Sequence, residues 1–208
     1  MLDARLTPMV KPLLSPVVSL LSRCGISADQ VTVAGFIIGV CAVPAIVGGL
    51  FNIALLCIVI NRICDGIDGE LARQTGSGSS AGGYLDICLD FLFYAAIPLG
   101  FGLANPAEWG VPALLLLCAF IGTGSSFLAF ATAAEKYQIE RPQFAHKSFY
   151  YMQGLTEGSE TILFFIAVCL WPQAFTVLAY IFACACFITV FTRIAGGYRT
   201  LRRVGKDG

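Results

Sequence analysis

The chain alternates long apolar runs with short polar connections. A membrane-spanning helix needs about 20 mostly apolar residues. The runs that reach or approach this length are residues 31–51, 52–73, 82–103, 111–134, 157–171 and 174–198. The fifth run is short, so we expect its first turn to rise from the preceding loop. This pattern predicts an all-α integral membrane protein with six transmembrane helices that form a single domain over residues 1–208.

The first 30 residues are less apolar, and we expect them to form an interfacial segment before the first span. Residues 2–22 alternate apolar side chains with Arg5 and Lys11, which is typical of an amphipathic segment lying on the membrane surface. Prolines at positions 8, 12 and 16 argue against a single unbroken helix. The pattern also differs from that of a cleavable signal peptide.

The composition supports a membrane protein and excludes several other classes. Hydrophobic residues make up 57% of the chain and charged residues 12%, whereas soluble domains carry about 25% charged residues. The formal net charge is zero, so bulk charge carries no information about a partner. The nine cysteines are scattered without a Cys-x-x-Cys pair, so we interpret them as small apolar residues and not as a disulfide or zinc framework. Gly35 and Gly39 are expected to allow close helix packing.

Lysine and arginine residues fall on one side of the predicted topology. They occur in the N-terminal segment, beside the connection of spans two and three, in the connection of spans four and five, and near the C-terminus. The opposite connections, around residues 52, 105–110 and 171–173, contain none. Because positive charge marks the cytoplasmic side, both termini and the polar ends of spans two and three are expected there.

Four aspartates interrupt spans two and three near one end. Asp65 and Asp68 are three residues apart, and Asp86 and Asp90 are four apart, so each pair lies on one face of its helix. Carboxylates at membrane depth are costly and mark functional sites. A divalent metal ion is the simplest explanation, because Mg²⁺, Mn²⁺ and Ca²⁺ prefer hard oxygen ligands.

Two alternative roles of these aspartates stay open at this point. Arg62 and Arg73 could neutralise some of them in a purely structural ion-pair set. However, four aspartates and Glu70 exceed two arginines by three, and uncompensated buried charge is strongly destabilising. A divalent-cation transporter could use the aspartates as its ion site, although the sequence has no second copy of the cluster and no visible inverted repeat.

The segment at 65–90 reads Asp-x₂-Asp-Gly-x₂-Ala-Arg-x₈-Gly-x₃-Asp-x₃-Asp. It resembles the signature of the CDP-alcohol phosphotransferase (CDP-alcohol phosphatidyltransferase) family at all eight fixed positions. These are Asp65, Asp68, Gly69, Ala72, Arg73, Gly82, Asp86 and Asp90. The six-span topology, the amphipathic N-terminal segment and the motif at the cytoplasmic ends of spans two and three are also similar to those of the family. Stretches such as residues 89–94 and 120–130 resemble its YnjF-like bacterial branch.

This resemblance implies an enzyme of phospholipid biosynthesis. It would transfer a phosphatidyl group from CDP-diacylglycerol to a small alcohol and release CMP. The cofactors implied are two divalent metal ions, Mg²⁺ or Mn²⁺, and the location implied is the bacterial inner (cytoplasmic) membrane. The partners implied are membrane lipids and a second copy of the chain in a homodimer, with no nucleic acid. Transfer from CDP-choline or CDP-ethanolamine to diacylglycerol is the alternative reaction.

The resemblance also assigns expected roles to individual residues. Asp90 is expected to act as the catalytic general base on the alcohol. The expected metal ligands are Asp65, Asp68, Asp86 and Asp90. The expected donor-binding residues are Asp65, Gly69, Ala72, Arg73 and Gly82. Asn61, one helical turn before Asp65, could orient a metal ligand or touch the donor, or it could equally make a polar contact between helices.

The acceptor side of the site is less well defined by the sequence. Its polar candidates are Lys147, Glu157, Glu160 and Arg193. The two glutamates open the fifth span, where the helix dipole favours negative charge, and the two cations could equally be interfacial anchors. Glycerol 3-phosphate is the acceptor favoured by the family resemblance, while other small alcohols stay open. His146, the only histidine, is expected to be a solvated loop residue.

Overall fold

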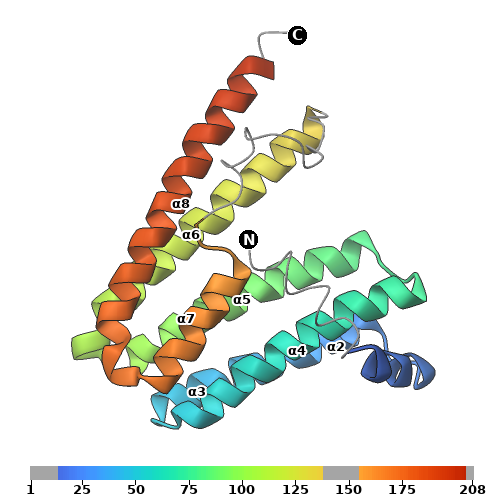
Figure 1. Ribbon diagram of the computed structural model, residues 1–208, viewed down its shortest axis with the longest axis horizontal. Helices are drawn as coiled ribbons and strands as arrows, with labels where there is room; N and C mark the ends of the chain where they lie inside the picture. The colour runs from blue at the N-terminus through green and yellow to red at the C-terminus, as the bar shows by residue number, and fades with distance from the viewer. Residues whose placement is uncertain (1–13, 138–154, 205–208) are drawn as a thin grey trace.

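The computed structural model describes residues 14–137 and 155–204, and every regular element in these ranges is helical. The helices in chain order are α2 (Ala28–Val40), α3 (Ala42–Val47), α4 (Phe51–Thr75), α5 (Ser80–Ala104), α6 (Pro106–Lys136), α7 (Gly158–Leu170), the 3₁₀ turn η1 (Pro172–Ala174) and α8 (Phe175–Val204). Figure 1 shows how they are arranged. Residues 14–23, before α2, are also helical. The prediction of an all-α fold is confirmed.

Helices occupy all six predicted runs, but they differ in how well they suit a membrane. Within the described residues, the stretches long and apolar enough to cross a membrane are 28–47, 80–104, 106–136 and 172–203. α4 has 25 residues, several of them charged. α7 has 13 residues, so it is about 20 Å long, which is less than the roughly 30 Å of a hydrocarbon core. The protein is a multi-pass membrane protein, and the figure of six spans stays a prediction.

The first predicted span is divided into two helices. α2 ends at Val40 and α3 begins at Ala42. Pro44 has no N–H group to bond the carbonyl of Val40, four residues earlier, so the regular α-helical hydrogen bonding stops there. At the other end, Ser27 and Gln30 form a capping box that fixes where α2 begins.

Two glycines let α2 lie against its neighbours almost at backbone distance. A Cβ atom added to Gly35 would lie 2.6 Å from the Cβ of Cys64 on α4. One added to Gly39 would lie 2.8 Å from the ring of Phe93 on α5. The predicted role of these glycines in close helix packing is therefore confirmed.

The described part of the N-terminal segment packs on the polar ends of α2 and α4. Val18 is fully buried in a small apolar cluster with Val31, Ile67 and Leu71. Leu20, on the other side of the same helix, is 62% exposed. This helix is thus amphipathic, as an interfacial element requires.

Aromatic side chains close the end of the bundle that lies away from the aspartates. The ring centroids of Phe101 and Phe175 stack 4.4 Å apart, and Phe51 and Trp109 pack around them. This aromatic cluster holds α4, α5, α6 and α8 together at that end of the bundle. From there the α4–α5 pair and the α6–α8 pair diverge, as Figure 1 shows. The motif end of α4 and α5 is therefore flanked by α2 and not by α8.

Candidate functional site

A short turn between α4 and α5 brings the two halves of the motif together. α4 ends at Thr75 and is followed by the capping residue Gly76, whose φ of 63° is left-handed and suits glycine. α5 starts at Ser80 and is capped by Ser79, whose hydroxyl accepts a hydrogen bond of 2.9 Å from the backbone N–H of Gly82. Because the connection is so short, the helices run antiparallel, and the aspartate-bearing faces of α4 and α5 meet.

Three of the four predicted metal ligands form one cluster. Asp65 from α4 and Asp86 and Asp90 from α5 each offer a carboxylate oxygen, and these oxygens lie within 4.8 Å of one another. All three residues are partly buried. A set of three convergent carboxylates fits a hard divalent cation such as Mg²⁺ or Mn²⁺, which would offset their mutual repulsion.

Asp68, the fourth predicted ligand, has another partner. Its Oδ2 accepts a hydrogen bond of 2.6 Å from the hydroxyl of Thr32 on α2, and the residue is only 6% exposed. Asp68 lines the same small cavity as the other three aspartates, but it is not one of the three whose oxygens converge. The structure therefore places Asp68 beside the cluster and joined to α2.

Arg62 lies inside the cluster, where the sequence had suggested that it could neutralise some of the aspartates, but its contact with Asp90 was not foreseen. Its Nη2 lies 2.6 Å from Oδ1 of Asp90 and its Nη1 lies 3.6 Å from Oδ2 of Asp65. Its Nε donates to Asn61, whose side-chain amide in turn donates to the backbone oxygen of Gly35. Asn61 therefore makes the predicted helix–helix contact and also holds the arginine.

A cavity of about 400 Å³ opens at the α4–α5 turn, next to the cluster. It is lined by Gly69, Ala72 and Gly82, three of the predicted donor-binding residues. A Cβ atom on Gly82 would lie 2.8 Å from Oδ1 of Asp29, so a side chain at this position would push the carboxylate of Asp29 aside. Asp29 and Thr32 of α2 also line the cavity, and their only signal in the sequence is their polarity at the start of a span.

The other two predicted donor-binding residues lie elsewhere. Asp65 belongs to the aspartate cluster and lines the small cavity there. Arg73 is bonded to Glu70 one turn earlier, with its Nη2 2.9 Å from Oε2, and its side chain is 55% exposed. The guanidinium of Arg73 thus lies near the C-terminal end of α4 and not against the aspartate cluster.

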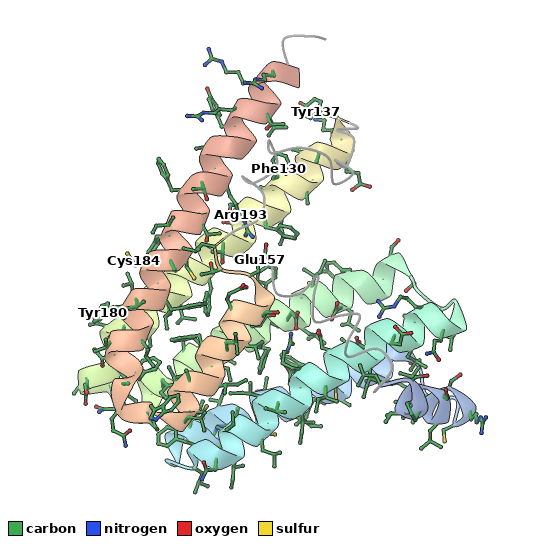
Figure 2. All side chains as sticks on the ribbon, in the orientation of Figure 1. Phe130, Tyr137, Glu157, Tyr180, Cys184 and Arg193 are labelled. Atoms are coloured by element: carbon green, nitrogen blue, oxygen red, sulfur yellow. The ribbon has the colours of Figure 1, made fainter. Side chains whose placement is uncertain are left out.

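A second cavity, of about 410 Å³, lies between α5, α6, α7 and α8. Its polar lining includes Glu157 and Arg193, two of the predicted acceptor-side residues, together with Thr123. Nη1 of Arg193 donates to the backbone oxygen of Thr123 at 3.2 Å. Figure 2 shows Glu157 at the start of α7 and Arg193 on the neighbouring part of α8. Tyr94 of α5 lines this cavity and also accepts a hydrogen bond from Arg62, so it links the cavity to the cluster.

The remaining acceptor-side candidates do not line the second cavity or cannot be placed. Glu160 accepts from the backbone N–H of Glu157 in the capping box that starts α7, so its carboxylate has the capping role that the helix dipole favours. Lys147 and His146 lie outside the described residues.

Comparisons with known proteins agree with the motif and the fold. The family model described as CDP-alcohol phosphatidyltransferase matches residues 26–191. Inner membrane protein YnjF of Escherichia coli is 53% identical over 207 residues and is matched along all of both chains. Archaetidylinositol phosphate synthase of Pyrococcus horikoshii is 31% identical over 118 residues, which cover 57% of this chain and 63% of that protein.

Solved structures show the same fold. Phosphatidylinositol phosphate synthase of Mycobacterium tuberculosis, in complex with manganese and citrate, superposes with a TM-score of 0.70 at 19% identity, over 89% of this chain and 88% of that chain. The same protein with CDP-DAG bound gives a TM-score of 0.67 at 20% identity, over 90% and 94%. The family match covers more than half of the chain and contains the whole aspartate cluster. The chain belongs to the CDP-alcohol phosphatidyltransferase family of enzymes.

Proposed function

We propose that this protein transfers a phosphatidyl group from CDP-diacylglycerol to a small phosphorylated alcohol, with release of CMP, at the cytoplasmic face of a bacterial inner membrane. The observation that carries the proposal is the convergence of Asp65, Asp86 and Asp90 within 4.8 Å, from two helices of the family motif. The location is supported by the inner-membrane relative from Escherichia coli and by the one-sided distribution of lysine and arginine.

The donor headgroup fits the cavity at the α4–α5 turn. Gly69, Ala72 and Gly82 supply a wall without bulky side chains, so a nucleotide can approach the helix backbones closely. The apolar halves of α4 and α5 lie beyond the motif, where the acyl chains of a membrane-embedded donor belong. Asp68 and Asp86 line this cavity as well as the cluster, which puts the pyrophosphate next to the carboxylates.

A divalent cation held by Asp65, Asp86 and Asp90 would offset the negative charge of the pyrophosphate and polarise the phosphorus under attack. The chain itself supplies the proton acceptor. The alcohol oxygen bonds to the phosphorus of the phosphatidyl group, the bond from that phosphorus to the CMP oxygen breaks, and Asp90 takes the hydroxyl proton. Arg62 donates a hydrogen bond to Oδ1 of Asp90 and would thereby orient the carboxylate that takes the proton.

The acceptor fits the second cavity, whose size is typical of a small-molecule site. Arg193 is the cation in its lining, and its Nε makes no hydrogen bond to the described residues. An arginine in this setting suits the phosphate of an acceptor such as glycerol 3-phosphate. Two relatives named for inositol phosphate lipids also favour a phosphorylated acceptor.

The second cavity lies below the ends of the long helices that surround it. α6 and α8 have 31 and 30 residues, or about 45 Å, whereas α7 is about 20 Å long. α7, with Glu157 at its start, therefore begins well below the ends of its neighbours (Figure 1). A water-soluble acceptor would enter from the cytoplasm along α6 and α8 and reach the level of Tyr94.

Purified protein incubated with CDP-diacylglycerol, Mg²⁺ or Mn²⁺ and a panel of alcohols tests the proposal. We expect CMP release that requires the metal, and a lipid product identified by mass spectrometry with glycerol 3-phosphate or inositol phosphate. Turnover with only unphosphorylated glycerol, inositol or serine would refute the acceptor assignment. CMP release only from CDP-choline or CDP-ethanolamine with diacylglycerol would refute the direction of transfer.

A further inference from the structure

Tyr94 lies where the wall of the second cavity meets the aspartate cluster. It lines the second cavity, whereas Arg62 and Asp90 line the small cavity among the aspartates. The hydroxyl of Tyr94 accepts a hydrogen bond of 3.2 Å from Nη1 of Arg62. Nη2 of the same guanidinium donates to Oδ1 of Asp90 at 2.6 Å. One guanidinium therefore connects the wall of the second cavity to the proposed base.

The guanidinium of Arg62 is held from several sides. Its Nε donates to Oδ1 of Asn61 at 3.0 Å, and Asn61 is itself buried. Its central carbon lies 5.3 Å from the ring centroid of Phe93, within range of a cation–π contact. The donors of a guanidinium lie in one rigid plane, so partners on Nε and Nη1 together set the direction in which Nη2 points at Asp90. The hydroxyl of Tyr94 is one of these two partners.

The ring of Tyr94 is fixed by aromatic packing. Its centroid lies 5.9 Å from that of Phe93 and 6.2 Å from that of Phe165, and both phenylalanines are fully buried. Phe165 belongs to α7, the helix that begins next to Glu157 in the second cavity. A phenylalanine at position 94 would keep this packing and lose only the hydroxyl. The hydrogen bond to Arg62 can therefore be removed without removing the wall of the cavity.

We propose that Tyr94 is a positioning residue for the transfer reaction: its hydroxyl holds the guanidinium of Arg62, which in turn directs the carboxylate of Asp90 at the alcohol. The inference rests on the proposed function, because it takes Asp90 as the base and the second cavity as the acceptor site. A base must stand within hydrogen-bond reach of the proton that it removes, and a displacement of about 1 Å can slow the chemistry strongly. Tyr94 thus acts on the chemical step and not on the affinity for either substrate.

Steady-state kinetics of Tyr94→Phe test this role, with CDP-diacylglycerol, Mn²⁺ and each acceptor that the wild type uses. We expect kcat to fall about 10- to 100-fold, the effect of losing one hydrogen bond to a charged group. The KM values of donor and acceptor should stay within about twofold, because the lost contact acts in the transition state. The fall should be the same for every acceptor. Tyr180→Phe removes the same atom from an exposed position of α8, away from Arg193 (Figure 2), and should match the wild type.

A double-mutant cycle with Arg62→Lys shows whether Tyr94 acts through the arginine. Lysine keeps the charge but lacks the planar fork that contacts Asn61, Tyr94 and Asp90 together. In that background, Tyr94→Phe should slow turnover by less than about twofold, because the two residues act as one unit. A full additional loss in the double variant would overturn the inference. So would a raised acceptor KM with unchanged kcat, or a fall in kcat with one acceptor only.

The outcomes separate this role from the proposed function. If the wild type releases no CMP with any acceptor, the proposed function is refuted and this role falls with it. If the wild type is active and Tyr94→Phe is equally fast, this role alone is refuted. If Arg62→Lys does not fold or does not turn over, the kcat and KM values of Tyr94→Phe decide the question.

Discussion

The contact of Gly35 with α4 offers a sharp test of how the site is held in place. Gly35 lies three residues after Thr32, the hydroxyl partner of Asp68. Its backbone oxygen accepts from Asn61, the residue that holds Arg62. The change Gly35→Ala would therefore press on the one interface through which α2 supports both Asp68 and Arg62.

The magnitude follows from the distance to Cys64. An alanine Cβ at position 35 would lie 2.6 Å from the Cβ of Cys64, whereas carbon atoms in contact normally stand about 3.5–4.0 Å apart. α2 and α4 would have to separate by roughly 1 Å, and overpacking of this kind costs about 1–3 kcal/mol. Alanine recovers about 0.5–1 kcal/mol from its better helix propensity, so part of the cost is masked.

Gly110→Ala is the matched control, because position 110 is also helical but no atom lies within 4 Å of its added Cβ. The Gly110→Ala variant should gain only the stability that comes from the better helix propensity of alanine. Gly35→Ala should then be less stable than Gly110→Ala by about 1–3 kcal/mol, or about 2–12 °C in melting temperature for a chain of this size. Thermal unfolding in detergent measures the difference. Equal melting of the two variants, or a higher value for Gly35→Ala, would show that the helices are not in contact at this distance.

Three other predictions concern the site and the topology. Asp90→Asn should slow CMP release by about 10²–10⁴-fold while CDP-diacylglycerol still binds, as equilibrium binding would measure; near wild-type turnover would exclude Asp90 as the base. Arg193→Gln should raise the KM of a phosphorylated acceptor far more than that of the donor, and equal changes in both would place Arg193 outside the acceptor site. In a background without native cysteines, single cysteines at 75–80 should label from the cytoplasm and those at 105–110 from the outside; the reverse pattern would overturn the charge argument.

The motif allowed much of the site to be predicted, because short spacings within a helix have fixed geometry. Asp86 and Asp90 had to share a face, and a short turn had to bring them to Asp65. The contacts that the sequence did not reveal join residues that are distant in the chain. Arg62 meets Asp90 across 28 positions and Thr32 meets Asp68 across 36.

Such contacts depend on how closely two helices approach, which is set by small residues and not by hydrophobic period. The hydrophobic pattern also predicted the first span as a single helix, because that pattern carries no information about the N–H group that Pro44 lacks. The sequence alone could not show which of the acceptor-side candidates lie together, for the same reason. Glu157 and Arg193 come from different helices and line one cavity only because α7 starts where α8 passes it. The homodimer stays a prediction.

The cavities proposed for the donor and the acceptor both border α5, and none of the residues that line one also lines the other. α5 presents Asp86 to the first cavity and Phe91 and Tyr94 to the second. If the proposed sites are correct, both substrates can be bound at the same time, and Asp90 follows Asp86 by one helical turn on the way to Tyr94 along α5. A ternary complex of this kind makes a covalent phosphatidyl-enzyme unnecessary. Initial-rate plots at several fixed acceptor concentrations should then intersect rather than run parallel, and a direct displacement should invert the configuration at phosphorus.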